Sequence, residues 1–133
     1  MENTITNYIE GNRIIHEWMG NKVWDIFDEP CDTGGVPLDY HKNWASLMEV
    51  VERIESLDIQ HFTSSISISD VEEVEGNFWF KTFLNTVEIL CNVDYWHPEY
   101  QIDGLGEYTG ETKLDATYTA VLSFINWHNK QIK

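Results

Sequence analysis

The chain has 133 residues, a length typical of one domain, and 42% of them are hydrophobic and 14% aromatic. This content argues against a disordered chain, and we expect a single domain over residues 1–133. The 23 acidic residues against eight lysines and arginines give a formal net charge of -15. Such a charge argues against binding to nucleic-acid phosphates or to an anionic membrane. A basic partner, a cation or solubility alone remain as explanations.

The first residues, Met1-Glu2-Asn3-Thr4, lack the basic segment and apolar run of a signal peptide. No stretch approaches the roughly 18 apolar residues that a membrane span needs. We therefore expect a cytoplasmic protein. Cys31 and Cys91 are the two cysteines, and reduced thiols are the default in that compartment. The sequence leaves open whether they pair.

The first predicted element is a helix over residues 5–19, where apolar residues recur at gaps of three and four. Gly11 weakens the middle of this helix, and Gly20 stands where a left-handed C-terminal cap belongs. Residues 22–28 predict a short strand. Residues 29–39 contain two prolines and a Gly-Gly pair, which predict a loop.

A second helix is predicted from Asn43, a residue suited to the N-cap position, to Ser56. Residues 59–69 then alternate between apolar and polar side chains, as a half-buried strand does. Residues 70–77 are dense in acids and predict a turn or loop.

The second half of the chain predicts a hairpin, a long connection and a last helix. Residues 78–84 and 87–93 are rich in aromatic and β-branched side chains and predict two paired strands. Residues 94–110 predict a long irregular loop, and residues 111–131 predict a helix with apolar residues on one face. The expected fold class is α+β, with three helices packed on a mainly antiparallel sheet of about four strands in the order αβαβββα.

Three segments resemble a known group of proteins: IIHEWMG at 14–20, WASLMEVVERIE at 44–55 and TKLDATYTAVLSFINW at 112–127. They resemble small uncharacterised proteins of Bacteroidetes genomes and their phages, some of which are labelled as phage α/β/α sandwich domains. The resemblance covers the helices and implies a shared scaffold, with no established chemistry. It also implies a phage or mobile-element context, in which inhibitors of host defence are common.

Catalytic and metal-binding motifs are not found in the sequence. It has no Gly-x-Ser-x-Gly elbow, no phosphate-binding glycine loop and no short Cys/His spacing. The acidic run 70–75 offers oxygen ligands but lacks the alternating calcium pattern that ends in a bidentate Glu. We expect a protein that is not an enzyme and needs no metal or cofactor.

The strongest candidate site is an acidic and aromatic region. Between Ile54 and Thr112 there are twelve acids against one cation, Lys81. Aromatic anchors beside carboxylates suit an interface with a basic protein, because rings supply contact area and charges steer the partner. The candidate partner-binding residues are Asp70, Glu72, Glu73, Glu75, Asp94, Trp96, Glu99, Tyr100, Asp103 and Glu107.

The leading hypothesis is therefore an acidic binding protein that blocks a basic, nucleic-acid-binding surface of a partner, such as a host defence nuclease of the CRISPR type. Three alternatives stay open. Trp96 and the neighbouring tyrosines could fold inward and close the edge of the core. The chain could be a small-ligand or nucleotide-sequestering module with residues 94–110 as its lid, which predicts an aromatic-lined pocket. It could also be a phage accessory protein that self-associates.

Overall fold

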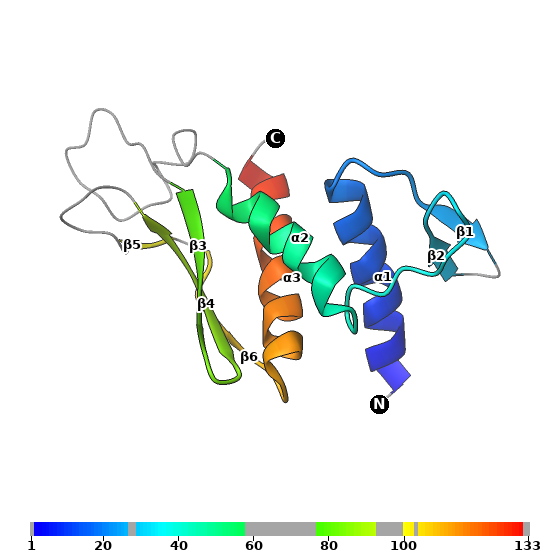
Figure 1. Ribbon diagram of the computed structural model, residues 1–133. Helices are drawn as coiled ribbons and strands as arrows, with labels where there is room; N and C mark the ends of the chain where they lie inside the picture. Colours follow the sequence, from blue (N-terminus) through cyan, green and yellow to red (C-terminus); the bar gives the residue numbers. More distant parts are fainter. Residues whose placement is uncertain (1, 27–28, 58–76, 93–99, 103, 132–133) are drawn as a thin grey trace.

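The computed structural model describes residues 2–26, 29–57, 77–92, 100–102 and 104–131. The fold is α+β, as predicted, and its helices and strands alternate in clusters along the chain (Figure 1). In chain order the elements are α1 (Glu2–Trp18), β1 (Trp24–Ile26), β2 (Glu29–Cys31), α2 (Trp44–Glu55), β3 (Asn77–Phe83), β4 (Thr86–Asn92), β5 (Tyr100–Gln101), β6 (Glu107–Thr109) and α3 (Lys113–Gln131). None of these three helices has the length and hydropathy of a membrane-spanning segment.

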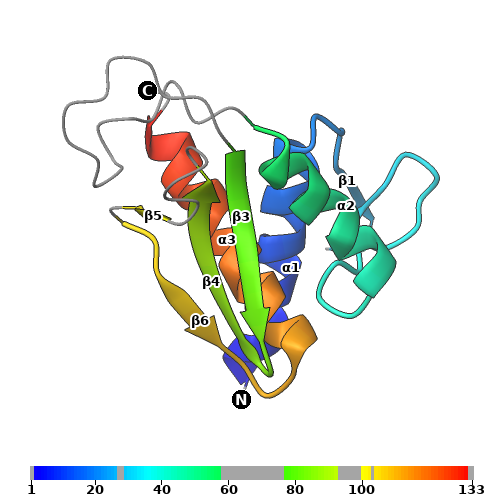
Figure 2. The same cartoon turned by 60° about the vertical axis from the view of Figure 1, so that its left-hand side comes forward.

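The strands form two antiparallel sheets. The small sheet is the β1–β2 pair, in which Trp24 lies opposite Cys31. In the larger sheet β3 and β4 form the predicted hairpin and pair along their whole length. The other edge of β4 pairs with β5 near one end and with β6 near the other (Figure 2).

The larger sheet and the helices form successive layers (Figure 1). Helix α3 packs against β4 and β6, and α2 packs against β3. Helix α1 packs against α3 and against β2 of the small sheet. The apolar face of α1 packs on the side of α3 that the larger sheet leaves uncovered, because α3 has apolar residues on both sides.

The core lies between the sheet and helices α2 and α3. Alternate residues of β3 and β4 point into it and are buried, including Phe78 and Ile89. Phe78 meets Phe124 of α3 edge to face, with ring centroids 4.8 Å apart. Rings in this arrangement attract each other beyond the area that they bury.

Local signals in the sequence set the ends of the first two helices. Asn43 is the N-cap of α2, as predicted, and its Oδ1 accepts a hydrogen bond of 3.1 Å from the backbone N–H of Ser46. Gly20 follows α1 with a φ of 86°, which confirms the predicted left-handed cap.

Two predictions about loops are wrong, and two others lie outside the described residues. Residues 29–39 contain β2, in which Pro30 is tolerated because this two-stranded sheet leaves edges that need no N–H donor. Residues 94–110 contain β5 and β6, whose two and three residues are too short to show an alternating pattern. The predicted strand at 59–69 and the acidic turn at 70–77 fall outside the description, apart from Asn77 at the start of β3.

Candidate functional site

Most of the predicted binding residues lie outside the part of the chain that the structure describes. These are Asp70, Glu72, Glu73, Glu75, Asp94, Trp96, Glu99 and Asp103. The other two, Tyr100 and Glu107, lie on strands β5 and β6, which pair with the same edge of β4. Tyr100 in β5 lies opposite Cys91, and Glu107 in β6 lies opposite Glu88. Of the predicted binding residues, Glu107 is therefore the one whose side chain the structure describes.

Glu107 belongs to a regular arrangement on the face of the sheet away from the helices. The strand registers place Lys81, Glu88 and Glu107 in one row across β3, β4 and β6. The next row, toward the hairpin turn, is Phe83, Thr86 and Thr109. A shallow hollow of about 330 Å³ lies between the rows and is lined by Lys81, Phe83, Thr86, Glu88 and Glu107. We call this group, together with Leu84, the hairpin surface.

Two large apolar side chains are exposed at the turn of this hairpin. Phe83 and Leu84 are each 72% exposed. Leu84 also has a φ of 52°, a left-handed conformation that costs a residue other than glycine about 1–3 kcal/mol. Neither core packing nor turn preference explains a leucine here. Glycine or asparagine would adopt this φ more readily and would not expose an apolar side chain to water.

The turn is held in place by the segment before α3. The side chain of Asn85 donates a hydrogen bond of 2.7 Å to the carbonyl of Gly110. The backbone N–H of Gly110 in turn donates to the carbonyl of Asn85 at 3.1 Å. These reciprocal bonds join the hairpin turn, next to Phe83 and Leu84, to the segment that leads into α3.

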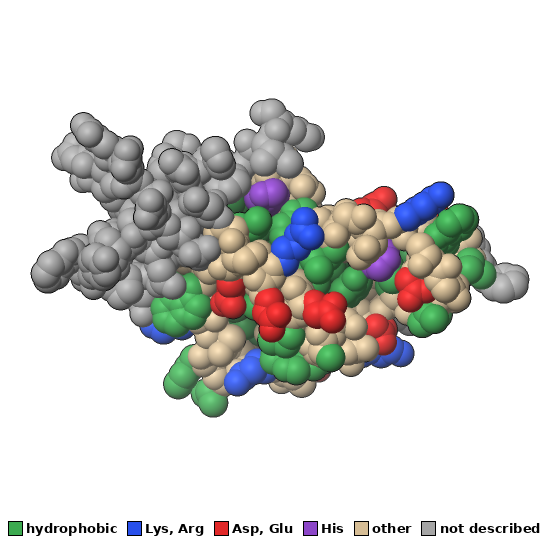
Figure 3. All heavy atoms as spheres, turned by 45° about the horizontal axis from the view of Figure 1, so that its top comes forward, with side chains coloured by type: hydrophobic (Ala, Val, Ile, Leu, Met, Phe, Trp, Pro, Cys, Tyr) green, Lys and Arg blue, Asp and Glu red, His purple; other side chains and the backbone are tan. Residues whose placement is uncertain are grey.

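The hairpin surface carries two carboxylates against one ammonium group, because Lys81 and Glu107 lie on either side of Glu88. Glu88 and Glu107 face each other across β4 and β6, and like charges in such a pair repel. Acidic side chains also occur elsewhere. Figure 3 shows a row of them over α2, where Glu49 and Glu52 are exposed. Negative charge is thus spread over several faces, and at the hairpin surface it lies beside the strongly exposed Phe83 and Leu84.

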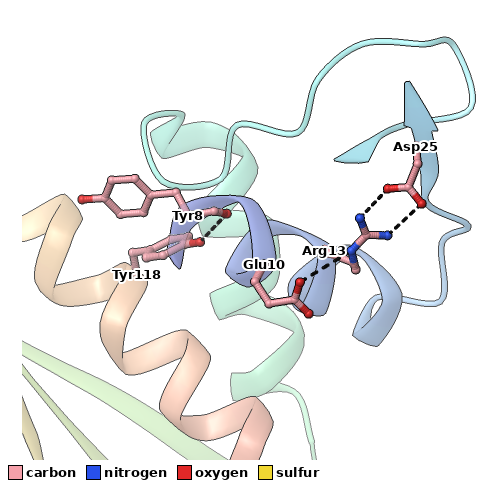
Figure 4. Close-up of polar contacts among 5 residues, drawn as sticks. All are labelled: Tyr8, Glu10, Arg13, Asp25 and Tyr118. Atoms are coloured by element: carbon pink, nitrogen blue, oxygen red, sulfur yellow. Dashed lines mark hydrogen bonds and ion pairs between the residues drawn. The ribbon is translucent and has the colours of Figure 1, made fainter. Parts of the chain in front are cut away.

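Among the described residues, Arg13 forms ion pairs with two acids. Figure 4 shows Arg13 of α1 reaching Asp25 of β1 and Glu10 of its own helix. Two guanidinium nitrogens bond the two carboxylate oxygens of Asp25, and this contact lowers the pKa of Asp25. Arg13 therefore fastens the small sheet to α1.

A separate pocket lies between α1 and the segment 37–42. Its volume is about 390 Å³, within the roughly 300–1,000 Å³ of small-ligand sites. Its lining residues are Tyr8, Ile9, Asn12, Pro30, Pro37, Leu38, Asp39, His41 and Lys42. The rings of Tyr8 and His41 stack with centroids 4.5 Å apart. The pocket is therefore walled by rings and aliphatic groups, with two charged residues among them.

A buried amide organises this pocket. Asn12 is 2% exposed, and its Nδ2 donates to the carbonyl of Leu38 and to Nδ1 of His41, both at 3.0 Å. Its Oδ1 accepts a bond of 3.0 Å from the Tyr118 hydroxyl. That hydroxyl also reaches the carbonyl of Tyr8, as Figure 4 shows. Helix α1, the segment 37–42 and helix α3 thus meet through the polar side chain of Asn12.

This network determines the protonation state of His41. The Leu38 carbonyl can only accept, so the Asn12 nitrogen must face it and offer its second hydrogen to His41. Nδ1 of His41 is therefore an acceptor, and the ring is neutral with its proton on Nε2. Burial lowers the pKa of His41, and the neighbouring charge of Lys42 lowers it further. Among described groups, none bonds Nε2, which remains a donor for a ligand or water.

Nucleophilic chemistry finds no support at the buried thiol. Cys91 is fully buried in the core, and burial raises its pKa to about 11. The thiolate that such chemistry needs is therefore disfavoured at neutral pH. Within the described ranges, no three His, Cys, Asp or Glu side chains converge as a metal site would require.

No sequence motif points to Asn12, His41 or the exposed pair Phe83 and Leu84. The histidines are scattered along the chain, and Asn12 carries no motif. The only available signal was the pair Phe83-Leu84 directly before the predicted turn. Large apolar residues at that position are typical of a strand and do not by themselves indicate exposure.

Comparisons of the chain with protein-family models, with curated proteins and with solved structures find no match. The function is therefore argued from the geometry and charge of these two sites.

Proposed function

We propose that this chain is a non-enzymatic acidic binding protein that covers a basic, nucleic-acid-binding surface of a protein partner. The observation that carries the proposal is the hairpin surface, where the facing pair Glu88 and Glu107 lies beside exposed Phe83. The net charge of -15 supports the same partner class, because it steers a basic protein toward the chain.

The hairpin surface suits such a partner in two ways. An arginine or lysine of the partner between Glu88 and Glu107 would relieve their repulsion, so the pair gains more from a cation than an isolated carboxylate does. Phe83 and Leu84 would enter an apolar depression beside that cation. Exposed rings at the centre of an interface carry much of its binding energy.

The biological setting is part of the proposal. In this proposal the chain is encoded by a phage or mobile element, where a protein that covers a nucleic-acid-binding surface would act against host defence. Carboxylates can occupy the positions of phosphates on a nuclease, including an RNA-guided one. The predicted binding residues Asp70, Glu72, Glu73, Glu75, Asp94, Glu99 and Asp103 lie outside the described residues, and their role in this interface stays a prediction.

The test is an affinity capture of partners with matched variants. The tagged chain is incubated with bacterial host lysate at about 50 mM and about 500 mM salt, and bound proteins are identified by mass spectrometry. We expect a nucleic-acid-handling protein that is retained at low salt and released by added RNA or DNA.

Two charge-reversal variants decide whether the hairpin surface is responsible. Glu88→Lys with Glu107→Lys should abolish capture. Glu49→Lys with Glu52→Lys makes the same change in net charge on α2 and should only weaken it. If the two pairs of substitutions weaken capture equally, the interaction is a non-specific charge attraction. Unchanged capture by the first pair would refute the role of the hairpin surface.

A further inference from the structure

The pocket between α1 and residues 37–42 is a site of its own. None of its described lining residues belongs to the hairpin surface, and none comes from residues 94–110. A ligand there would therefore be bound independently of the partner proposed above. The hydrogen bonds of Asn12 to Leu38, His41 and Tyr118 are formed without a ligand.

The lining combines apolar walls with a donor pair and an acceptor. Ile9, Pro30, Pro37 and Leu38 supply aliphatic surface. Nε2–H of His41 and the ammonium group of Lys42 are donors that favour a carboxylate. Asp39 adds a carboxylate that favours an ammonium group, and its Oδ2 already accepts a bond from Asn43 at 3.2 Å.

The charge of the molecule narrows the ligand class. Anionic ligands such as nucleotides are repelled by a net charge of -15, and among the described lining residues Lys42 is the one lysine or arginine. A simple cation would satisfy Asp39 but leave the two donors without an acceptor. A small zwitterion avoids both the repulsion by the net charge and the loss of an acceptor for the two donors, because it has no net charge and carries one group of each sign.

We propose that this pocket binds a free α-amino acid with an apolar side chain. The carboxylate of the ligand accepts from Lys42 and from Nε2 of His41, and its ammonium group pairs with Asp39. The side chain of the ligand lies against the aliphatic wall. Asn12 is a positioning residue, because its hydrogen bond fixes the ring of His41 with Nε2–H as the available donor.

The test compares three probes that share a phenyl ring and differ in charge. L-Phenylalanine is a zwitterion, phenethylamine lacks the carboxylate and phenylacetate lacks the ammonium group. Binding to the full chain is measured by calorimetry and by amide chemical shifts. We expect L-phenylalanine to bind at least about tenfold more tightly than either analogue, with shifts at His41 and Lys42.

Two variants assign the charged groups. Lys42→Met should weaken the binding of L-phenylalanine by about tenfold and leave the affinity for phenethylamine unchanged. Asp39→Asn should weaken the binding of L-phenylalanine and leave the affinity for phenylacetate unchanged. Lys22→Met is the matched control, because Lys22 lies over the ring of Trp24 and does not line the pocket. Circular dichroism confirms that each variant is folded.

Three outcomes would overturn the proposal. They are the absence of saturable L-phenylalanine binding up to about 10 mM, equal affinities for the three probes, and shifts confined to residues outside the pocket. None of these results depends on the protein partner. Failure here and failure of the capture experiment are therefore distinguishable.

Discussion

Glu88 of β4 lies directly opposite Glu107 of β6, so two carboxylates face each other across neighbouring strands. Like charges in this position destabilise a sheet by a few tenths of a kcal/mol up to about 1 kcal/mol. Glu107→Gln should therefore raise the free energy of unfolding by about 0.2–1 kcal/mol, measured by urea denaturation. Glu49→Gln on exposed α2 is the control and should change it less. A loss of stability in Glu107→Gln would show that the two carboxylates do not repel each other.

Leu84 should be replaceable with a gain in stability. Leu84→Asn removes the apolar side chain, and asparagine tolerates the φ of 52° better than leucine. We expect the free energy of unfolding to rise by about 1 kcal/mol. Leu84→Thr also removes the apolar side chain, but its β-branch is less compatible with this conformation, so stability should fall. Both variants should weaken partner capture. Equal stabilities of the two would show that the backbone here is unstrained.

Gly11 should resist replacement, although alanine is the better helix former. The hydroxyl of Tyr118 occupies the space that a Cβ at Gly11 would need, and Leu122 is close as well. Gly11→Ala should therefore lower the free energy of unfolding by about 1–3 kcal/mol through overpacking. In a Tyr118→Phe background the loss should be smaller, which a double-mutant cycle in urea measures. Strict additivity of the two changes would contradict this packing.

Asn12→Asp should be strongly destabilising. A carboxylate cannot donate to the Leu38 carbonyl, and a buried acceptor left without a donor costs about 1–3 kcal/mol. The change is measured as a shift in the urea midpoint. Asn126→Asp, at an exposed position of α3, is the control and should be nearly neutral. Similar midpoints for the two variants would mean that Asn12 does not organise the pocket.

Stability should decrease as the pH falls below about 6.5. Burial lowers the pKa values of His16, His41 and His128. The unfolded chain therefore binds protons first as the pH falls, and protonation favours unfolding. The lowered pKa of Asp25 acts in a lower range, below about pH 4. Urea denaturation at about pH 7.5 and about pH 5.5 tests the prediction.

His128 offers a control for the pH dependence. Its Nδ1 accepts a bond of 3.2 Å from the indole N–H of Trp18, which can only donate, so this nitrogen is unprotonated. Asparagine in its place offers an amide oxygen as acceptor and does not titrate. His128→Asn should therefore flatten the pH dependence. An unchanged slope would exclude His128 as a contributor.

The sequence by itself determined the features that depend on neighbouring residues. The apolar stripe and Asn43 cap of α2 act within one or two helical turns, and the predicted helix agrees with the structure. The β3–β4 hairpin was predicted because both strands and their turn are contiguous. The excess of acids over lysines and arginines is a property of composition and needs no fold.

Tertiary structure alone decided which distant residues meet. Strands β5 and β6 are too short to show a pattern and exist because β4 offers them an edge. Asn12 and Tyr118 are 106 positions apart, and Glu107 meets Glu88 only through strand register. Hydrophobic burial brings such groups together, and it depends on the total surface that all elements cover. No local spacing in the chain encodes that surface, so both candidate sites became visible only in the folded molecule.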